Sequence, residues 1–215
     1  MKFNNNFKIG KSTIAKNKPT YFIADVGANH DGDIKKAKKI IKLCARSGAD
    51  AVKFQHFEAK TIVSDYGFKK LKSKQSHQSK WKKSVYKTYQ DASININWTK
   101  ILKEECKNNN IDFFTSPYSL ELVDFVNKFI CAYKIGSGDI SWHQIIEKIS
   151  KKQKPVLLAT GASTLNEIKK AVKVVLKNNN KIVIMQCNTN YTADKNNLNF
   201  INLKVLDTFK KEFPN

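Results

Sequence analysis

Short apolar runs recur along the chain and alternate with helical patterns, and this alternation limits the fold more than any other feature. The runs are rich in β-branched and aromatic residues, as buried strands are. They occupy residues 21–26, 50–54, 111–115, 131–135, 155–159 and 181–186. Helical patterns with one apolar face cover residues 33–47, 98–107, 119–128, 142–151, 165–177 and 199–212. Strands alternating with helices predict βαβ units and a parallel sheet.

Several of the expected helices carry recognisable start and stop residues. Thr164 and Glu167 have the spacing of a capping box. Ser119 is placed as an N-cap, and Asp31 or Asp33 is placed to cap the helix at 33–47. Gly48 follows that helix, where a glycine commonly ends one.

Residues 56–96 interrupt the regular spacing of strands and are rich in Lys, Ser and Gln. A connection this long is usually functional or disordered. It follows a strand, so it belongs at the carboxyl edge of the sheet, where α/β enzymes place their chemistry. Its aromatic residues, Trp81, Tyr86 and Tyr89, predict that the second half packs as a helix or lid.

Length and composition fit one globular domain of 215 residues. No apolar run approaches the ~20 residues of a membrane span, so we expect no membrane segment. The first residues lack the apolar core of a signal peptide, which predicts a cytoplasmic protein. The four cysteines lie far apart without a C-x-x-C pair and are interpreted as reduced thiols.

The formal net charge of +21 has two interpretations. Of the 39 basic residues only Arg46 is an arginine, and lysines occur in every segment beside many asparagines. Nucleic-acid readers favour arginine, so this pattern is more typical of codon bias than of specific nucleic-acid binding. A field that attracts an anionic substrate is the functional alternative, and nonspecific polyanion binding follows from either.

Polar clusters end the apolar runs, and this placement indicates an enzyme site. Polar residues at the carboxyl ends of parallel strands converge on one mouth in a barrel or a doubly wound sheet. The clusters lie at residues 25–30, 53–55, 115–117, 134–139, 160–161 and 187–190.

Lys53 and Lys134 lie inside apolar strand ends, where an unpaired lysine is costly to bury. Three interpretations remain for each lysine. Its ammonium group reaches solvent or pairs with Asp25 or Asp139. Alternatively, the two lysines hold a phosphate or carboxylate, or one of them forms a Schiff base. The two aspartates are either charge partners or catalytic groups.

The histidines give little evidence for a metal site. His30 lies in N-H-D-G-D, which is more typical of a loop that caps a helix than of a metal ligand. His56, His77 and His143 show no ligand spacing and are assigned surface or structural roles. P-loop, dinucleotide-binding, nucleophile-elbow and H-E-x-x-H motifs are absent from the sequence.

Six segments of the chain resemble the sialic acid synthases, which condense phosphoenolpyruvate with N-acetylmannosamine or a related N-acetylated amino sugar. The segments are IADVGANHDGD (23–33), GADAVKFQHF (48–57), FFTSPY (113–118), AYKIGSGD (132–139), KPVLLATGAS (154–163) and MQCNTNYT (185–192). The resemblance implies a (β/α)8 TIM barrel, a divalent metal such as Mn2+ or Mg2+, and a homodimer for the complete protein. It also implies a small C-terminal antifreeze-like domain.

The same resemblance assigns roles by motif. Lys53 and Lys134 would bind the phosphate and carboxylate of phosphoenolpyruvate, assisted by Ser116 and Ser137. Asp25 would hold the sugar near its reacting end, and Asp139 would handle the proton of the attacking water. The remaining sugar-binding positions would be Gln55, Asn188, Thr189 and Tyr191.

This chain departs from the family pattern at several positions. Asp25 and Asp139 stand where many members have Glu, Ala159 where serine is common, and Gln186 where histidine is common. These changes suggest a divergent subgroup whose sugar differs from N-acetylmannosamine.

The C-terminal end is the largest departure. The two metal-binding histidines of the family are expected beyond residue 215. We therefore expect residues 1–215 to be the N-terminal part of a barrel domain, with about six βα units, without the last two units and the C-terminal domain. The alternative functions are a catalytically incompetent barrel or phosphoenolpyruvate-binding remnant, and a polyanion binder.

Overall fold

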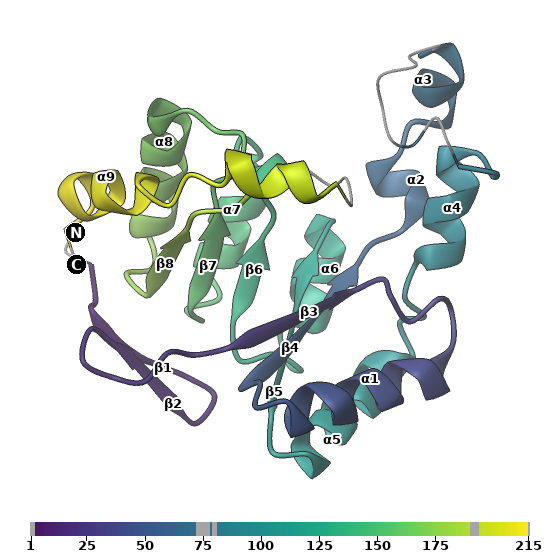
Figure 1. Ribbon diagram of the computed structural model, residues 1–215, viewed down its shortest axis with the longest axis horizontal. Helices are drawn as coiled ribbons and strands as arrows, with labels where there is room; N and C mark the ends of the chain where they lie inside the picture. The colour runs from purple at the N-terminus through teal and green to yellow at the C-terminus, as the bar shows by residue number, and fades with distance from the viewer. Residues whose placement is uncertain (1–2, 72–77, 79–80, 190–193, 215) are drawn as a thin grey trace. The chain divides into compact units, whose positions relative to one another are not determined.

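A computed structural model describes residues 3–71, 78, 81–189 and 194–214. The chain divides into two compact units (Figure 1). The central unit comprises residues 20–130, and the terminal unit combines residues 1–19 with residues 131–215. Within the described residues, each unit contains three parallel strands that alternate with helices. The predicted α/β class and its parallel strands are therefore confirmed.

The central unit has the strand order β3-β4-β5, formed by Ile23–Gly27, Ala51–His56 and Asp112–Pro117. Its longer helices, α1, α5 and α6, cover Ile34–Arg46, Trp98–Asn108 and Leu120–Val126. The side chains of Phe54 and Phe114 are fully buried in its core. Three shorter helices follow β4 and cover Ala59–Ile62 (α2), Asp65–Lys70 (α3) and Val85–Ala92 (α4).

The terminal unit has the strand order β6-β7-β8, formed by Tyr133–Ile135, Val156–Ala159 and Ile182–Met185. Helices α7 (His143–Ser150) and α8 (Leu165–Leu176) pack against one another. Helix α9 covers Val205–Glu212, and 3-10 turns form at Ser137–Asp139 and Lys195–Phe200. The predicted last helix at 199–212 is therefore shorter, because the chain adopts a 3-10 turn before α9.

The predicted caps are present. Asp33 accepts a hydrogen bond from the Lys35 amide, and Gly48 adopts a φ of 84°, the left-handed conformation that a glycine allows after a helix. Ser119 caps α6. Thr164 and Glu167 form the reciprocal capping box of α8. Local side-chain chemistry therefore defines these helix ends.

An N-terminal hairpin was not predicted. Strands β1 (Asn6–Ile9) and β2 (Ser12–Ala15) pair antiparallel, and Gly10 adopts a φ of 54° in the turn. Phe7 and Ile9 alternate with exposed residues and are buried. The period-two alternation around this glycine is the signal that could have identified the hairpin.

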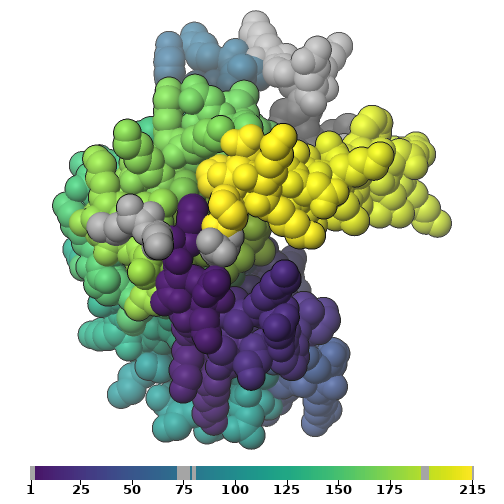
Figure 2. Space-filling model, turned by 90° about the vertical axis from the view of Figure 1, so that its left-hand side faces the viewer, coloured from purple at the N-terminus to yellow at the C-terminus, as the bar shows by residue number. Residues whose placement is uncertain are grey.

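The two ends of the terminal unit lie side by side. The first described residues lie next to α9 (Figure 2). The ring centroids of Phe3 and Phe213 are 6.5 Å apart in an edge-on arrangement. The Asn4 amide also donates to the Asn180 carbonyl at 3.0 Å. These contacts attach the hairpin to β8 and α9.

Three short helices, α2, α3 and α4, form within residues 56–96 in the part that the structure describes. Helix α4 confirms the prediction that the second half of this segment packs as a helix. The Tyr89 ring of α4 lies 5.7 Å from Phe57 and 6.2 Å from Trp81, so the aromatic residues pack the segment against the end of β4. Within the described residues, no helix is both long and apolar enough to cross a membrane.

Candidate functional site

One face of the central sheet carries four of the predicted site residues. Asp25 is the register partner of Lys53, and Gln55 is the register partner of Ser116. Because side chains alternate between faces along a strand, Lys53 and Gln55 point to the same side, together with their partners. The sheet geometry therefore brings together two residues predicted to bind phosphoenolpyruvate and two predicted to bind the sugar.

Lys53 and Asp25 form an ion pair with a nitrogen–oxygen distance of 3.0 Å. The Lys53 side chain is only 7% exposed, whereas the Asp25 side chain is 64% exposed. A buried ammonium group requires a partner, and the pairing confirms the interpretation of Asp25 as its charge partner. The exposed carboxylate remains open to other ligands on its outer side.

A β-bulge at Val26 places Asp25 beside Gln55. The register between β3 and β4 shifts after Asp25, and Gly27 adopts a φ of 54°. A methyl group at Gly27 would lie 3.6 Å from an Asp25 oxygen and 3.8 Å from the Gln55 side-chain oxygen. The Asp25 and Gln55 side chains therefore lie on either side of the Gly27 α-carbon, which carries no side chain. A β-bulge commonly redirects a side chain near an active site.

Ser116 is buried on the same face, and its hydroxyl oxygen has no hydrogen-bond partner among the described residues. A buried hydroxyl without a partner costs free energy, so such a group in a folded protein calls for a ligand or water. Its register position opposite Gln55 places it on the sheet face that also carries Lys53.

The opposite face of the same strands holds a buried histidine. His56 contacts Thr115 on β5 at 2.9 Å through Nδ1 and Thr99 on α5 at 2.8 Å through Nε2. Burial, and then the nearby His30, lower the pKa of His56 to about 4, so the ring is neutral at physiological pH. His56 therefore joins α5 to the sheet, as its predicted structural role implies. His77 lies outside the described residues.

His30 is also fully buried, next to the Phe54 and Trp98 rings. Its Nδ1 accepts a hydrogen bond from the Gly32 amide at 3.1 Å, while the buried Nε2 has no partner among the described residues. Burial lowers its pKa. Neither the burial of His30 nor its unpaired nitrogen was predicted from sequence. The glycine at position 32, which indicates a tight turn, is the only sequence feature that points to this local structure.

The terminal unit positions a second group of predicted residues. Lys134 lies on β6, and its ammonium group donates to the Ile135 carbonyl at 3.1 Å. Ser137 and Asp139 follow in the 3-10 turn after that strand. Burial raises the pKa of Asp139 to about 6, against the opposing effects of the Lys134 charge and the Gly136 backbone. A carboxyl group with this pKa exchanges protons near neutral pH.

Three strand ends of the terminal unit meet around Gly161. The Gly161 amide donates to the Ser137 hydroxyl oxygen at 3.0 Å, and Thr189 packs against the glycine α-carbon. Asn188 is exposed, and its side-chain amide donates a hydrogen bond to the Asn197 backbone carbonyl at 3.3 Å. Tyr191, the remaining predicted sugar-binding residue, lies outside the described residues. The contact at Gly161 was missed from sequence because T-G is a common turn pair.

The described residues do not fit a divalent metal by themselves. They include no group of three or more His, Cys, Asp or Glu side chains that could hold such an ion. Asp25 is a single carboxylate already paired with a lysine. Ca2+, Mg2+ and Mn2+ sites require several oxygen or imidazole ligands, so any metal needs ligands from outside this set.

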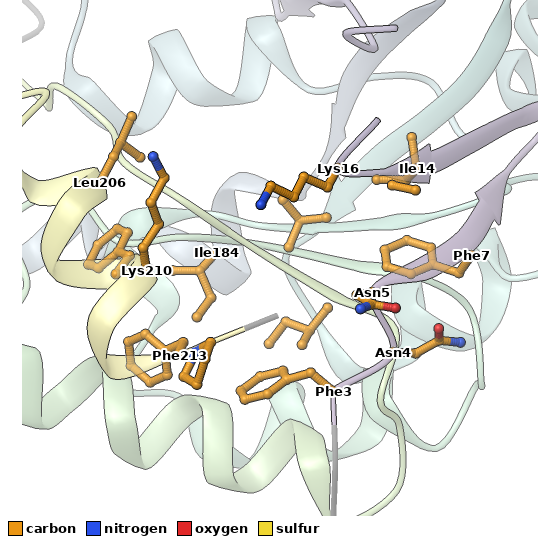
Figure 3. A pocket seen from close by; sticks show the side chains of 15 residues that line it. Phe3, Asn4, Asn5, Phe7, Ile14, Lys16, Ile184, Leu206, Lys210 and Phe213 are labelled. Carbon is orange, nitrogen blue, oxygen red and sulfur yellow. The ribbon is translucent and has the colours of Figure 1, made fainter. Parts of the chain in front are cut away.

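A separate cavity of about 760 Å³ lies in the terminal unit and contains none of the predicted site residues (Figure 3). Its walls come from the hairpin, β8 and α9, including Phe7, Ile184 and Phe209. Lys16 and Lys210 extend over its rim. The cavity is apolar and lacks titratable groups other than these lysines, so it is not where we place the chemistry.

Known proteins resemble the chain in sequence. N,N'-diacetyllegionaminic acid synthase of Campylobacter jejuni is 36% identical over 203 residues, which cover 91% of this chain and 58% of that protein. Pseudaminic acid synthase of the same organism is 30% identical over 201 residues, or 91% of this chain and 56% of that protein. The chain thus spans a little over half the length of these curated relatives.

Solved structures share the fold. N-acetylneuraminic acid synthetase from Leptospira borgpetersenii, crystallised with citrate, aligns with a TM-score of 0.83 at 22% identity, covering 99% of this chain and 68% of that one. The spore coat polysaccharide biosynthesis protein spsE of Bacillus subtilis aligns with a TM-score of 0.79 at 26% identity, covering 97% and 54%. The chain therefore shares the fold of the matched part of these two structures.

The family model described as the NeuB family matches residues 40–215. This span includes Lys53, Ser116, Lys134 and Ser137, so it contains both groups of candidate anion-binding residues. The resemblance to sialic acid synthases is confirmed, and the chain belongs to the NeuB family.

Proposed function

We propose that this protein is part of a transferase that condenses phosphoenolpyruvate with an N-acetylated amino sugar to give a sialic acid-type nonulosonic acid and phosphate. The observation that carries the proposal is the buried Lys53 ammonium on the same sheet face as the unpartnered, buried Ser116 hydroxyl. A fixed cation and a free donor are what an anionic substrate requires. Membership of the NeuB family supplies the reaction class.

In this proposal the four residues that the family resemblance assigns to phosphoenolpyruvate keep that role. Lys53 and Ser116 of the central unit and Lys134 and Ser137 of the terminal unit are assigned to its phosphate and carboxylate groups. Lysine ammonium groups fixed by their strands hold these anions before reaction, so the reactive carbon is oriented without further ordering. Substrate binding would compete with Asp25 for the Lys53 ammonium group.

The sugar is assigned to Asp25, Gln55, Asn188, Thr189 and Tyr191. Asp25 and Gln55 present oxygen atoms around Gly27, which suits the hydroxyl and amide donors of an amino sugar. Asp25 is one methylene shorter than the glutamate of many relatives. A different sugar from N-acetylmannosamine, within the same N-acetylated class, is consistent with that change.

The proposed reaction forms one carbon–carbon bond and breaks one carbon–oxygen bond. C3 of phosphoenolpyruvate attacks the aldehyde carbon of the open-chain sugar, whose oxygen becomes a hydroxyl group. Water adds at C2 and gives one proton to Asp139, which passes it to the sugar alkoxide. The bond between C2 and the phosphate oxygen then breaks, C2 becomes a ketone, and the second proton of the water leaves with phosphate. The pKa of about 6 lets Asp139 accept and return a proton near neutral pH.

A divalent metal, Mn2+ or Mg2+, is proposed only for the complete enzyme. The described residues do not assemble its ligands. None of the roles given to Lys53, Lys134, Asp25 or Asp139 depends on the ion.

The complete barrel is a further part of the proposal. Two more βα units, supplied from outside residues 1–215, would pair with the outer edge of β8 and fill the apolar cavity beside it (Figure 3). An open strand edge flanked by an apolar cavity is a ready acceptor for a strand. A C-terminal domain, a homodimer and a cytoplasmic location are proposed from the same family resemblance.

The proposal is tested by phosphate release. The chain is incubated with phosphoenolpyruvate, Mn2+ and a panel of N-acetylated amino sugars, and inorganic phosphate is measured. We expect release only when both phosphoenolpyruvate and one of the sugars are present. Lys134→Ala should abolish it, whereas Lys39→Ala, which removes an exposed lysine of α1, should leave it unchanged.

Two results would argue against this account. Release that does not depend on the sugar contradicts the condensation, and full activity in Lys134→Ala contradicts the site assignment. Phosphoenolpyruvate binding without turnover favours the alternative function, a binding remnant of the barrel.

A further inference from the structure

Gly161 is the point where the segments that follow three consecutive strands of the terminal unit meet. The residue is buried directly after β7. A methyl group on its α-carbon would overlap the Thr189 Cγ2 methyl and would lie 3.0 Å from both the Cys187 carbonyl oxygen and the Ser137 hydroxyl oxygen. Ser137 follows β6, and the other two residues follow β8. Space at one α-carbon therefore sets how closely these three segments approach.

Hydrogen bonds hold Gly161 at this position. Both the amide and the hydroxyl of Thr160 donate to the Met185 carbonyl, at 3.1 Å and 2.9 Å. The Ser163 hydroxyl donates to the Gly161 carbonyl at 3.1 Å. The glycine is thus fixed to the end of β8 on one side and to its own loop on the other.

The Gly161 amide also determines what the Ser137 hydroxyl can do. A serine hydroxyl has one hydrogen to donate and two lone pairs that accept. Because Ser137 accepts from Gly161, one lone pair is occupied and its hydrogen remains available for a neighbouring acceptor. An anion binds a hydroxyl whose hydrogen points toward it, as a donor. A Ser137 hydroxyl that presented its lone pairs to the anion would repel it.

We infer that Gly161 is a positioning residue that holds Ser137 and Thr189 together as one unit. The Ser137 hydroxyl, predicted to bind phosphoenolpyruvate, and the Thr189 side chain, predicted to bind the sugar, therefore move together. The two ligand assignments rest on the proposed function. The packing of Ser137, Gly161 and Thr189 does not. A larger residue at position 161 separates the two side chains and weakens both substrate contacts.

The chain contains a matched control for this inference. Gly138 lies in the neighbouring turn, and a methyl group there would meet no heavy atom within 4 Å. Neither Gly138 nor Gly161 has a positive φ, so alanine introduces no backbone strain at either position. Any difference between Gly161→Ala and Gly138→Ala therefore reports the space around Gly161.

The experiment measures phosphoenolpyruvate affinity by calorimetry for Gly161→Ala, Gly138→Ala and Gly161→Ala combined with Thr189→Ser. Serine lacks the Cγ2 methyl that the added alanine methyl would strike. We expect Gly161→Ala to weaken binding at least about tenfold, Gly138→Ala to stay within about twofold, and Thr189→Ser to restore most of the loss. Equal effects at the two glycines, or no recovery in the double variant, would overturn the inference.

A second measurement separates this inference from the proposed function. Hydrogen exchange of the Gly161 amide is followed without ligand in the wild-type chain and in Ser137→Ala. Loss of the acceptor should speed exchange at this amide at least about tenfold while distant amides stay unchanged. An unchanged rate contradicts the inferred packing whatever the ligand result. A wild-type chain that binds no phosphoenolpyruvate contradicts the proposed function instead.

Discussion

At the scale of a single residue, Asp139 has a proposed functional role, and its ionised carboxyl group lowers the free energy of unfolding. Burial raises the pKa of its carboxyl group to about 6, above its usual value of 3.8, so ionising it in the folded protein is unfavourable. The folded state therefore holds the proton more tightly than the unfolded chain. The free energy of unfolding consequently falls as pH rises from about 4 to 6.

Asp139→Asn removes this cost because asparagine is neutral at every pH. We expect the variant to be more stable than wild type at pH 8 by up to about 3 kcal/mol, with the difference vanishing near pH 4. Its condensation activity should be lost, because the amide cannot accept the proton. Urea unfolding at the two pH values checks the prediction, and a variant less stable than wild type at pH 8 would argue against a buried carboxylate.

His56 acts on stability in the opposite direction. Its pKa is lowered from 6.5 to about 4, so the unfolded chain takes up the proton first as pH falls. The free energy of unfolding should therefore drop between pH 6.5 and 4, by up to about 3 kcal/mol. In wild type the Asp139 carboxyl offsets part of this drop. The loss should be steeper in Asp139→Asn, and an NMR titration in which the His56 ring protonates near pH 6.5 would disprove the assignment.

At the scale of the elements, the capping box of α8 gives a direct test of local structure. The Thr164 hydroxyl accepts from the Glu167 amide, and the Glu167 carboxylate accepts from the Thr164 amide at 2.7 Å. Thr164→Ala should lower the free energy of unfolding by about 1 kcal/mol, whereas Thr164→Ser keeps the hydroxyl and should cost much less. Thermal or urea unfolding of the two variants measures the difference, and equal losses would show that the hydroxyl is not what stabilises the helix.

The capped helices and buried strands could be predicted from sequence because their signals are local. The expected strand at 181–186 is found at Ile182–Met185, and the helix at 165–177 is found at Leu165–Leu176. The hairpin was missed because its strands have only four residues each and β1 contains asparagine and lysine, so the apolar-run criterion did not detect them. The 3-10 turn at Lys195–Phe200 lies mostly before the predicted helix at 199–212 and was not predicted.

The site could be predicted only in part, for a related reason. Strand-end clusters identified Lys53, Asp25 and Ser116, since register places such residues on one face. The β-bulge at Val26, the buried His30 and the packing around Gly161 depend on contacts between segments distant in sequence. No local pattern encodes contacts of that kind.

At the scale of the whole molecule, specific anion binding is distinct from the general attraction of a chain with a formal net charge of +21. Any lysine adds to a long-range field, and that field weakens with salt. Only lysines at the strand ends should contribute a contact that persists at physiological ionic strength. The distinction also decides between the synthase account and a polyanion binder.

Calorimetric titration with phosphoenolpyruvate at about 0.15 M salt tests this claim most directly. Lys53→Met, Lys134→Met and Lys39→Met each remove one positive charge, but Lys39 lies exposed on α1. We expect saturable binding to wild type, a loss of at least about tenfold in each strand-end variant, and wild-type affinity in Lys39→Met. Equal losses in all three variants, or no binding to wild type, would contradict the account.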